Sequence, residues 1–220
     1  MRDLNQEIIK FNYERNFKDD DFYVSKSNEH IFDLLMSWPK WEKNFLNISG
    51  PKFSGKTHLI NIFLKKFKGI KLDAKILSND HFKNLKIYQN IVLENLDKNI
   101  DENLVYSLFN FVDQDNKYLI VTSEEAIVDI NFGLKDLRSR TKNFLLQSIT
   151  NPDDDLMYAL ILKNLSDRQI FLDKKLIEYI IKRIDRSYGK ISDFIYKIDE
   201  RSLKMKRSID LKIIKEVLGD

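Results

Sequence analysis

The chain has 220 residues, of which 43% are hydrophobic and 32% are charged. This hydrophobic fraction is enough to build a core, which excludes a disordered chain. The 37 basic and 34 acidic residues leave a net charge of only +3, so a dedicated nucleic-acid-wrapping surface is not indicated. Cysteine is absent, which excludes disulfides, thiolate zinc sites and cysteine nucleophiles.

The apolar segments of the chain are too short to cross a membrane as helices. The longest run, residues 156–162, has seven residues, whereas a membrane span needs ~18. Residues 1–7 lack the apolar core of a signal peptide. A soluble cytoplasmic protein is therefore expected. Residues 1–21 are mostly polar and charged and are predicted to form an N-terminal arm.

Short apolar segments alternate with amphipathic ones in the first two thirds of the chain. Segments 45–49, 91–93, 118–121 and 144–146 are typical of buried strands, and segments 57–67 and 103–112 carry helical spacing. Strands that alternate with helices predict crossover units and a parallel sheet. After Asn151-Pro152, apolar residues recur only at helical spacing. The sequence thus predicts an α/β nucleotide-binding domain over residues 22–150 and an all-helical domain over residues 151–220.

Residues 50–57, with the sequence GPKFSGKT, match the phosphate-loop pattern G-x-x-x-x-G-K-[ST] at every fixed position. A predicted strand precedes them and a predicted helix follows, as this motif requires. The backbone amides and the helix N-terminus would bind phosphate oxygens. Lys56 would reach the β- and γ-phosphates, and the Thr57 hydroxyl would hold magnesium. The alternative is an ordinary glycine-rich turn, but the context favours nucleotide binding.

The magnesium site also needs a carboxylate at the end of a neighbouring strand. Residues 90–97, NIVLENLD, are the one good candidate, and Glu94 can serve the metal through water. The next residue is Asn95, whose amide cannot take a proton from water, so hydrolysis in cis should be slow. Two alternatives remain open: Glu94 only caps a strand, or Asp97 has taken over the chemistry.

Polar and basic residues near two later elements are further candidates. Thr122 and Ser123 follow a predicted strand, where they could sense a γ-phosphate or only form a turn. Arg138 and Arg140 could act on phosphate or be solvated surface charges. The histidines lack the spacing of metal ligands and are interpreted as structural or surface residues; they are His30, His58 and His81.

Taken in order, these motifs resemble the DnaA-related AAA+ family over almost the entire chain, and most of all its Hda-type members. The matching segments are 20–28 (the opening segment that forms the adenine pocket), 38–41 (a tryptophan-proline signature), 50–57 (Walker A), 93–97 (Walker B), 108–110 (the helix that follows), 121–123 (sensor 1), 136–140 (the Ser-Arg box), 151–152 (the start of the lid) and 186–190 (sensor 2).

The resemblance implies an AAA+ P-loop NTPase fold, with a parallel sheet flanked by helices and an all-helical lid. It also implies that ADP or ATP binds with Mg²⁺, the metal being held at Thr57 and Glu94. The nucleotide-contacting residues implied by the family motifs are Phe22, Val24, Asn28, Gly50, Lys52, Ser54, Gly55, Lys56, Thr57, His58, Thr122 and Lys190.

The resemblance further implies a role in replication control. Arg140 matches the arginine finger, which would act in trans on ATP bound to the initiator DnaA. Gln6, Ile9 and Phe11 fit the shape of a peptide that binds the DNA polymerase III sliding clamp, in the place where Hda-like proteins carry one. The alternative is a tail with incidental apolar residues. DNA would be contacted only through the clamp, and self-association is possible in this family.

Two departures from the family pattern bear on catalysis. Lys190 stands where sensor 2 has an arginine, and Glu94-Asn95 stands where DnaA-like chains usually carry two aspartates. Both changes should weaken ATP hydrolysis in cis while leaving nucleotide binding intact. The chain ends after the lid, so we expect a regulator rather than an initiator with a DNA-reading domain. The alternatives are an AAA+ ATPase of the helicase-loader type and a P-loop small-molecule kinase.

Overall fold

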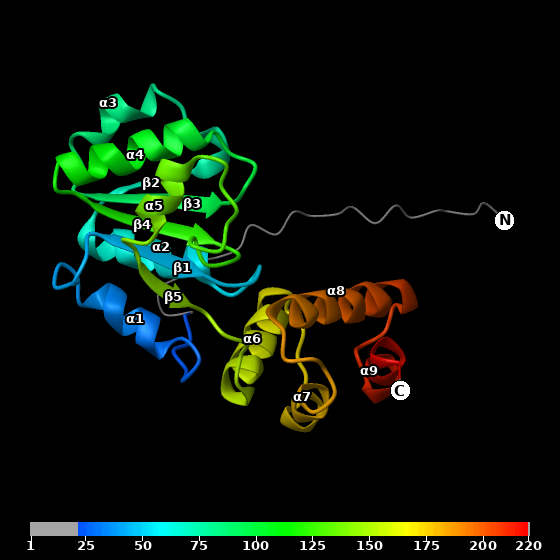
Figure 1. The fold of residues 1–220 in the computed structure, drawn as a ribbon. Helices are drawn as coiled ribbons and strands as arrows, with labels where there is room; N and C mark the ends of the chain where they lie inside the picture. Colours follow the sequence, from blue (N-terminus) through cyan, green and yellow to red (C-terminus); the bar gives the residue numbers. More distant parts are fainter. Residues whose placement is uncertain (1–21, 220) are drawn as a thin grey trace.

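The computed structural model describes residues 22–219, and within them the strands form one parallel sheet in the order β2-β3-β4-β1-β5 (Figure 1). The predicted parallel α/β fold is confirmed. One strand, β2, lies at an edge of the sheet and was not expected, because its four residues include two charged ones. The strands are β1 (Phe45–Ser49), β2 (Ile70–Asp73), β3 (Asn90–Leu96), β4 (Tyr118–Ser123) and β5 (Leu145–Ser148).

Helices cover both faces of the sheet. α3, α4 and α5 pack on one face, whereas α1 and α2 pack on the other. A short 3₁₀ helix, η2 (Ala74–Ile76), follows β2. The α-helices are α1 (Glu29–Met36), α2 (Lys56–Phe67), α3 (His81–Leu85), α4 (Glu102–Gln114), α5 (Lys135–Thr141), α6 (Asp154–Asp167), α7 (Lys174–Ile181), α8 (Tyr188–Met205) and α9 (Leu211–Leu218).

The inner strand β3 shows how the sequence places side chains on the two faces of the sheet. Leu93 packs into the cluster with Phe109 of α4, whereas Val92 packs into the opposite cluster with Phe63 of α2. Side chains alternate along a strand, and a strand covered on both faces is therefore apolar at successive positions. Each large side chain buried in this way contributes about 1.5–3 kcal/mol. The sheet is thereby a rigid platform for the loops at its ends.

The segment over residues 38–41 contributes to the core beneath α1 and α2. The Trp38 ring lies 5.1 Å from that of Phe67, and the Trp41 ring lies 5.8 Å from that of Phe63. The indole nitrogen of Trp41 donates to the carbonyl oxygen of Leu34 at 2.7 Å. These contacts join the end of α1 to α2, the helix that follows the phosphate loop.

The four C-terminal helices α6–α9 form a separate cluster, set off from the sheet beyond β5 (Figure 1). The predicted helical lid is confirmed. An aspartate caps the N-terminus of three of these helices, for example Asp153, which accepts a bond from the amide of Leu156. Among the helices of residues 22–219, none is both long and apolar enough to span a membrane.

Candidate nucleotide site

The phosphate loop lies where the order of the strands reverses. β1 has β4 on one side and β5 on the other, whereas the chain leaving β1 runs to β2 at the far edge. Ligands of open α/β sheets bind at such a switch point, outside the carboxyl ends of the strands. The amide of Gly50 donates to the carbonyl oxygen of Ser123 at 3.2 Å, which joins the loop to the end of β4.

Glycine is favoured at positions 50 and 55 of this loop for different structural reasons. A Cβ at Gly50 would lie 3.1 Å from both Ile149 Cβ and Ser54 Oγ, so the loop is too tight there for a side chain. Gly55 has φ of 89° and is the residue that caps α2, a left-handed conformation that glycine adopts without strain. The loop is thereby curled over the N-terminus of α2.

One hydroxyl in the curl has no hydrogen-bond partner among the described residues. Ser54 is only 6% exposed, and its Oγ accepts or donates no hydrogen bond in residues 22–219. Thr57 lies in the first turn of α2, where the helix amides are also available. A buried hydroxyl without a partner beside a helix N-terminus is satisfied when an anion such as phosphate binds there.

The Lys56 side chain folds back over the loop. Its Nζ donates to the carbonyl oxygens of Gly50 at 2.5 Å and Pro51 at 2.9 Å. Burial lowers the pKa of Lys56, while the carboxylates of Glu124 and Glu94 act in the opposite direction. The ammonium group thus lies at the mouth of the loop, bound only to neutral carbonyls, and phosphate oxygens would be stronger acceptors.

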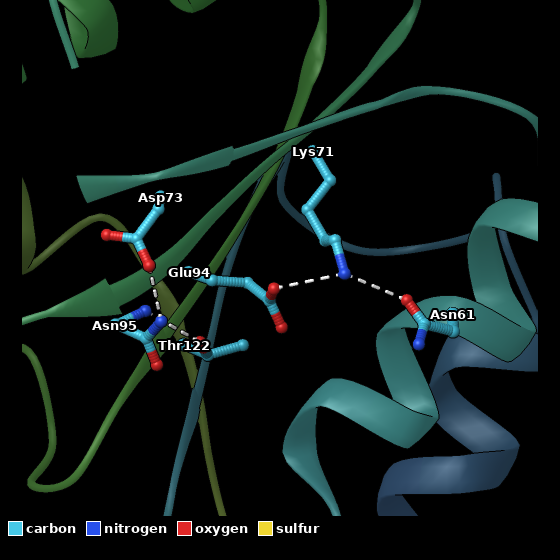
Figure 2. A network of polar contacts seen from close by, with 6 residues as sticks. All are labelled: Asn61, Lys71, Asp73, Glu94, Asn95 and Thr122. Atoms are coloured by element: carbon cyan, nitrogen blue, oxygen red, sulfur yellow. Dashed lines mark hydrogen bonds and ion pairs between the residues drawn. The ribbon is translucent and has the colours of Figure 1, made fainter. Parts of the chain in front are cut away.

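Glu94 lies at the end of β3 with its carboxylate buried (Figure 2). Its Oε2 is 3.2 Å from Nζ of Lys71, and its Oε1 is buried and has no hydrogen-bond partner in the part of the chain that the structure describes. Residues 22–219 hold no cluster of three or more acidic, histidine or cysteine side chains that could bind a metal alone. Mg²⁺ in such sites takes one or two protein ligands together with phosphate oxygens, and the open Glu94 Oε1 fits that requirement.

Asn95 points toward the sheet edge. Its φ is 60° at a break in the β3–β4 register, which asparagine tolerates better than most residues. Its side-chain Nδ2 donates to Asp73 Oδ2 at 2.7 Å, and its backbone amide donates to Thr122 Oγ1 at 3.1 Å (Figure 2). Thr122 therefore holds the β3 backbone. Asp97 accepts a bond from the amide of Asn99 at 2.7 Å, in the turn that follows.

Glu124 is a carboxylate of this site that sequence reasoning missed. It follows β4, pairs with Lys52 at 3.5 Å and acts electrostatically on Lys56. Buried Asn47 of β1 holds this connection, because it donates to Ser123 Oγ at 2.9 Å and accepts from the amide of Ile127. The signal was an acid directly after Thr122-Ser123. Lys71 and Asp73 were missed because β2 was missed.

The opening segment lies against the phosphate loop. The Phe22 ring is 5.3 Å from the ring of His58, edge to face, and a Cβ at Gly55 would touch Phe22. Buried Asn28 braces the segment internally, since Oδ1 accepts from the amide of Ser25 and Nδ2 donates to the Tyr23 carbonyl. The structure thus brings Phe22 and His58 to the loop, while Val24 is exposed.

The first turn of α8 brings the lid to the same region. The Tyr188 hydroxyl donates to the carbonyl oxygen of Thr150 at 3.1 Å, and its ring joins the core under α2. Burial raises the pKa of Tyr188 to about 12, against a smaller opposing effect of the Ser27 hydroxyl. Lys190 follows in the same turn of α8 and is exposed. Tyr188 therefore fixes the position of the first turn of α8, which carries Lys190.

Arg140 lies apart from this site. It belongs to α5, on the face of the sheet opposite α2, and its guanidinium lies 3.2 Å from Asp113 Oδ2 and 5.6 Å from the centre of the Tyr106 ring. Arg138 lines a shallow surface pocket with Lys135 and Lys142. The proposed clamp-binding residues Gln6, Ile9 and Phe11 lie outside the described residues.

Comparison with known proteins finds similarity to DnaA proteins and to a model of the Hda lid. The family model "Hda, lid domain" matches residues 153–218. The chromosomal replication initiator protein DnaA of Caldanaerobacter subterraneus is 24% identical over 91% of the chain and 51% of its own length. The DnaA protein of Helicobacter pylori strain 26695 is 24% identical over 99% of the chain and 53% of its own length. The chain thus spans about half the length of the curated relatives it matches.

The solved structures show the same fold. Domain III of Thermotoga maritima DnaA covers 93% of this chain and 96% of its own, with a TM-score of 0.69 and 16% identity. Aquifex aeolicus DnaA with AMPPCP bound covers 84% of this chain and 66% of its own, with a TM-score of 0.63 and 19% identity.

Proposed function

We propose that this chain, which is similar to DnaA proteins and matches the Hda lid model over residues 153–218, is a nucleotide-binding regulator of chromosomal replication initiation. It binds ADP or ATP, docks on the sliding clamp and stimulates hydrolysis of ATP held by DnaA. The observation that carries this proposal is that the phosphate loop and Arg140 lie in different parts of the domain. The phosphate loop leads into α2, whereas Arg140 belongs to α5, which packs on the opposite face of the sheet.

The nucleotide phosphates bind the phosphate loop in this proposal. Ser54 contributes a buried hydroxyl, Lys56 an ammonium group, and α2 the positive end of its dipole. Glu94 Oε1 and the Thr57 hydroxyl hold Mg²⁺, which supplies charge neutralisation at the phosphates. Adenine lies between Phe22 and the lid, with Lys190 as a point charge near the phosphates.

Hydrolysis of the protein's own nucleotide is slow in this proposal. Asn95 cannot act as a base, and its amide is hydrogen bonded to Asp73. Lys190 carries a charge but lacks the bidentate fork of arginine. In this proposal the site therefore retains the groups that bind a nucleotide and lacks the base and the arginine that would hydrolyse it.

Arg140 acts on a partner's ATP. A guanidinium supplied in trans stabilises the charge that spreads over the phosphoryl oxygens in the transition state, an effect worth ~10³–10⁵ in rate. In the free protein Arg140 is held by Asp113 and stacks near Tyr106 on α4. Asp113 is exposed and Tyr106 is half-buried, so breaking the ion pair costs little when a partner binds.

The clamp contact comes from the N-terminal arm in this proposal. Gln6 hydrogen bonds at the rim of the clamp groove, and Ile9 and Phe11 bury their side chains as anchors. DNA is then contacted only through the clamp. This role places the protein in the cytoplasm, where the chromosome is replicated.

The deciding experiment mixes the protein with clamp, DNA and ATP-loaded DnaA and follows phosphate release. Arg140→Ala should abolish the stimulation while ADP binding and clamp binding persist. Arg201→Ala is the matched control, because Arg201 also forms a surface ion pair, with Glu216 in the lid. Full stimulation by Arg140→Ala would show that Arg140 is structural.

Two further arms test the rest of the proposal. A variant lacking residues 1–12 should fold but lose clamp binding in a pull-down, and retained binding would exclude the arm as the docking peptide. The protein alone, with DNA and ATP, should release phosphate slowly. Rapid release without DnaA would favour the helicase-loader type of AAA+ ATPase instead.

A further inference from the structure

Lys71 reaches the acid of the nucleotide site from the edge strand β2. The register pairs Lys71 with Val92 and Asp73 with Glu94. Because paired residues share a face and side chains alternate along each strand, Lys71 and Glu94 both project toward α2. The Lys71 ammonium lies 3.2 Å from Glu94 Oε2 and donates to Asn61 Oδ1 of α2 at 3.0 Å (Figure 2).

This ion pair differs from the surface pairs of the chain. The Glu94 side chain is only 9% exposed and that of Lys71 is 35% exposed, whereas both partners of the Lys52–Glu124 pair are mostly in solvent. A buried carboxylate needs a partner, and removing it leaves an uncompensated charge. Asn61 fixes the direction from which the ammonium approaches. Lys71 therefore holds one oxygen of Glu94 and leaves the other, Oε1, without a partner.

The Glu94 carboxylate also acts electrostatically on the phosphate-loop lysine, Lys56. Its ion pair is with Lys71, so one carboxylate oxygen is engaged before any divalent cation arrives. We infer that Lys71 holds and partly neutralises Glu94 when no divalent cation is bound, and that it thereby makes nucleotide binding less dependent on that cation. This inference rests on the nucleotide binding that we propose above.

The size of the effect follows from simple electrostatics. A dication at Glu94 Oε1 and the Lys71 ammonium at Oε2 are like charges a few ångströms apart, and they repel even at the effective dielectric constant of a protein surface. The ammonium also neutralises the carboxylate that the cation would use. Loss of the positive charge at residue 71 should thus lower the Mg²⁺ concentration that gives half of the maximal Mg²⁺-dependent nucleotide binding, by about tenfold or more.

The test measures Mg²⁺ dependence of binding rather than turnover. A fluorescent ADP analogue with a methylanthraniloyl group is titrated into the full chain at a series of Mg²⁺ concentrations, and in EDTA. The wild-type protein should bind the analogue in EDTA with an affinity reduced less than about tenfold. The Lys71→Met variant should bind the analogue poorly in EDTA. It should reach full binding at a lower Mg²⁺ concentration than the wild-type protein does.

Matched variants separate charge from structure. Lys71→Arg keeps the charge and should retain the wild-type Mg²⁺ dependence. Lys75→Met removes an exposed lysine of the neighbouring 3₁₀ helix and should also leave it unchanged. Should Lys71→Met not fold, Lys71→Gln removes the charge while still donating to Asn61, and it carries the same expectation.

The outcomes distinguish this inference from the proposal beneath it. Binding of the analogue with equal Mg²⁺ dependence in wild type, Lys71→Met and Lys71→Gln would overturn the inference and leave nucleotide binding intact. Failure of the wild-type protein to bind the analogue at any Mg²⁺ concentration would overturn both.

Discussion

The side-chain amide of Asn95 donates to Asp73 Oδ2 over 2.7 Å, and this contact joins the ends of β3 and β2. Asn95 occupies the position at which a hydrolase carries its catalytic acid, and here its side chain contacts the edge strand β2 instead. Asp73 uses its other oxygen to accept from the amide of Lys75 at 2.9 Å. Both oxygens of Asp73 are engaged, so Asp73 is poorly suited to replace the missing base.

Asn95→Asp tests that contact. The new carboxylate would lie against Asp73, and like charges at this distance raise the pKa of the pair. The unfolded carboxyls titrate near pH 4, so the variant should be close to wild-type stability below that pH. Its free energy of unfolding should then fall as pH rises toward 7, as the folded pair ionises. Denaturant titrations at pH 4 and 7 measure this difference.

Asn95→Gly is the control for that experiment, because glycine accepts the positive φ and removes the bond without adding charge. Its loss of stability should be the same at both pH values. A pH-independent loss in Asn95→Asp as well would contradict the placement of Asn95 against Asp73.

Lys56→Ala should lose detectable ADP binding by calorimetry. The ammonium group is the charged donor of the phosphate loop, and a charge-assisted hydrogen bond is about twice as strong as a neutral one. Lys52→Ala is the matched control, since Lys52 lies in the same loop but pairs with Glu124 at the surface. Lys52→Ala should weaken binding far less. Wild-type affinity in Lys56→Ala would exclude this site.

Asp113→Asn should retain the stimulation of partner hydrolysis that Arg140→Ala loses. The Arg140–Asp113 pair is exposed, so its removal should change the free energy of unfolding by less than about 1 kcal/mol. The guanidinium remains free to act. Phosphate release with DnaA and clamp measures the first expectation and chemical denaturation the second. Loss of stimulation in Asp113→Asn would mean that the ion pair itself is the functional unit.

Tyr188→Phe should lower the free energy of unfolding by about 1 kcal/mol, because the bond to the Thr150 carbonyl is lost. The pKa of Tyr188 is raised to about 12, above the unfolded value of about 10. Its stabilising contribution is therefore full below pH 10 and is lost as pH rises through about 12.

The Tyr188→Phe variant should lack this part of the alkaline loss of stability, measured by denaturant titration between pH 9 and 12. Tyr196→Phe, at an exposed position of the same helix, should behave as wild type. Equal alkaline profiles for both variants would contradict the burial of the Tyr188 hydroxyl.

The sequence by itself determined the parallel α/β fold, the phosphate loop and the helical lid. These features are local or periodic. A buried strand such as β1 must be apolar at successive positions, and the left-handed turn into α2 favours glycine at position 55 for a local reason. Such constraints are written in neighbouring residues, so a pattern can be recognised without the tertiary structure.

Only the tertiary structure decided which side chains meet at the site. Strand β2 carries too few apolar residues to be recognised, yet it brings Lys71 to Glu94 and Asp73 to Asn95 across more than twenty residues of sequence. Glu124 reaches the phosphate loop because β4 pairs with β1. These side-chain contacts depend on strand order and register. Both are set by how the whole sheet buries its two faces rather than by any local pattern.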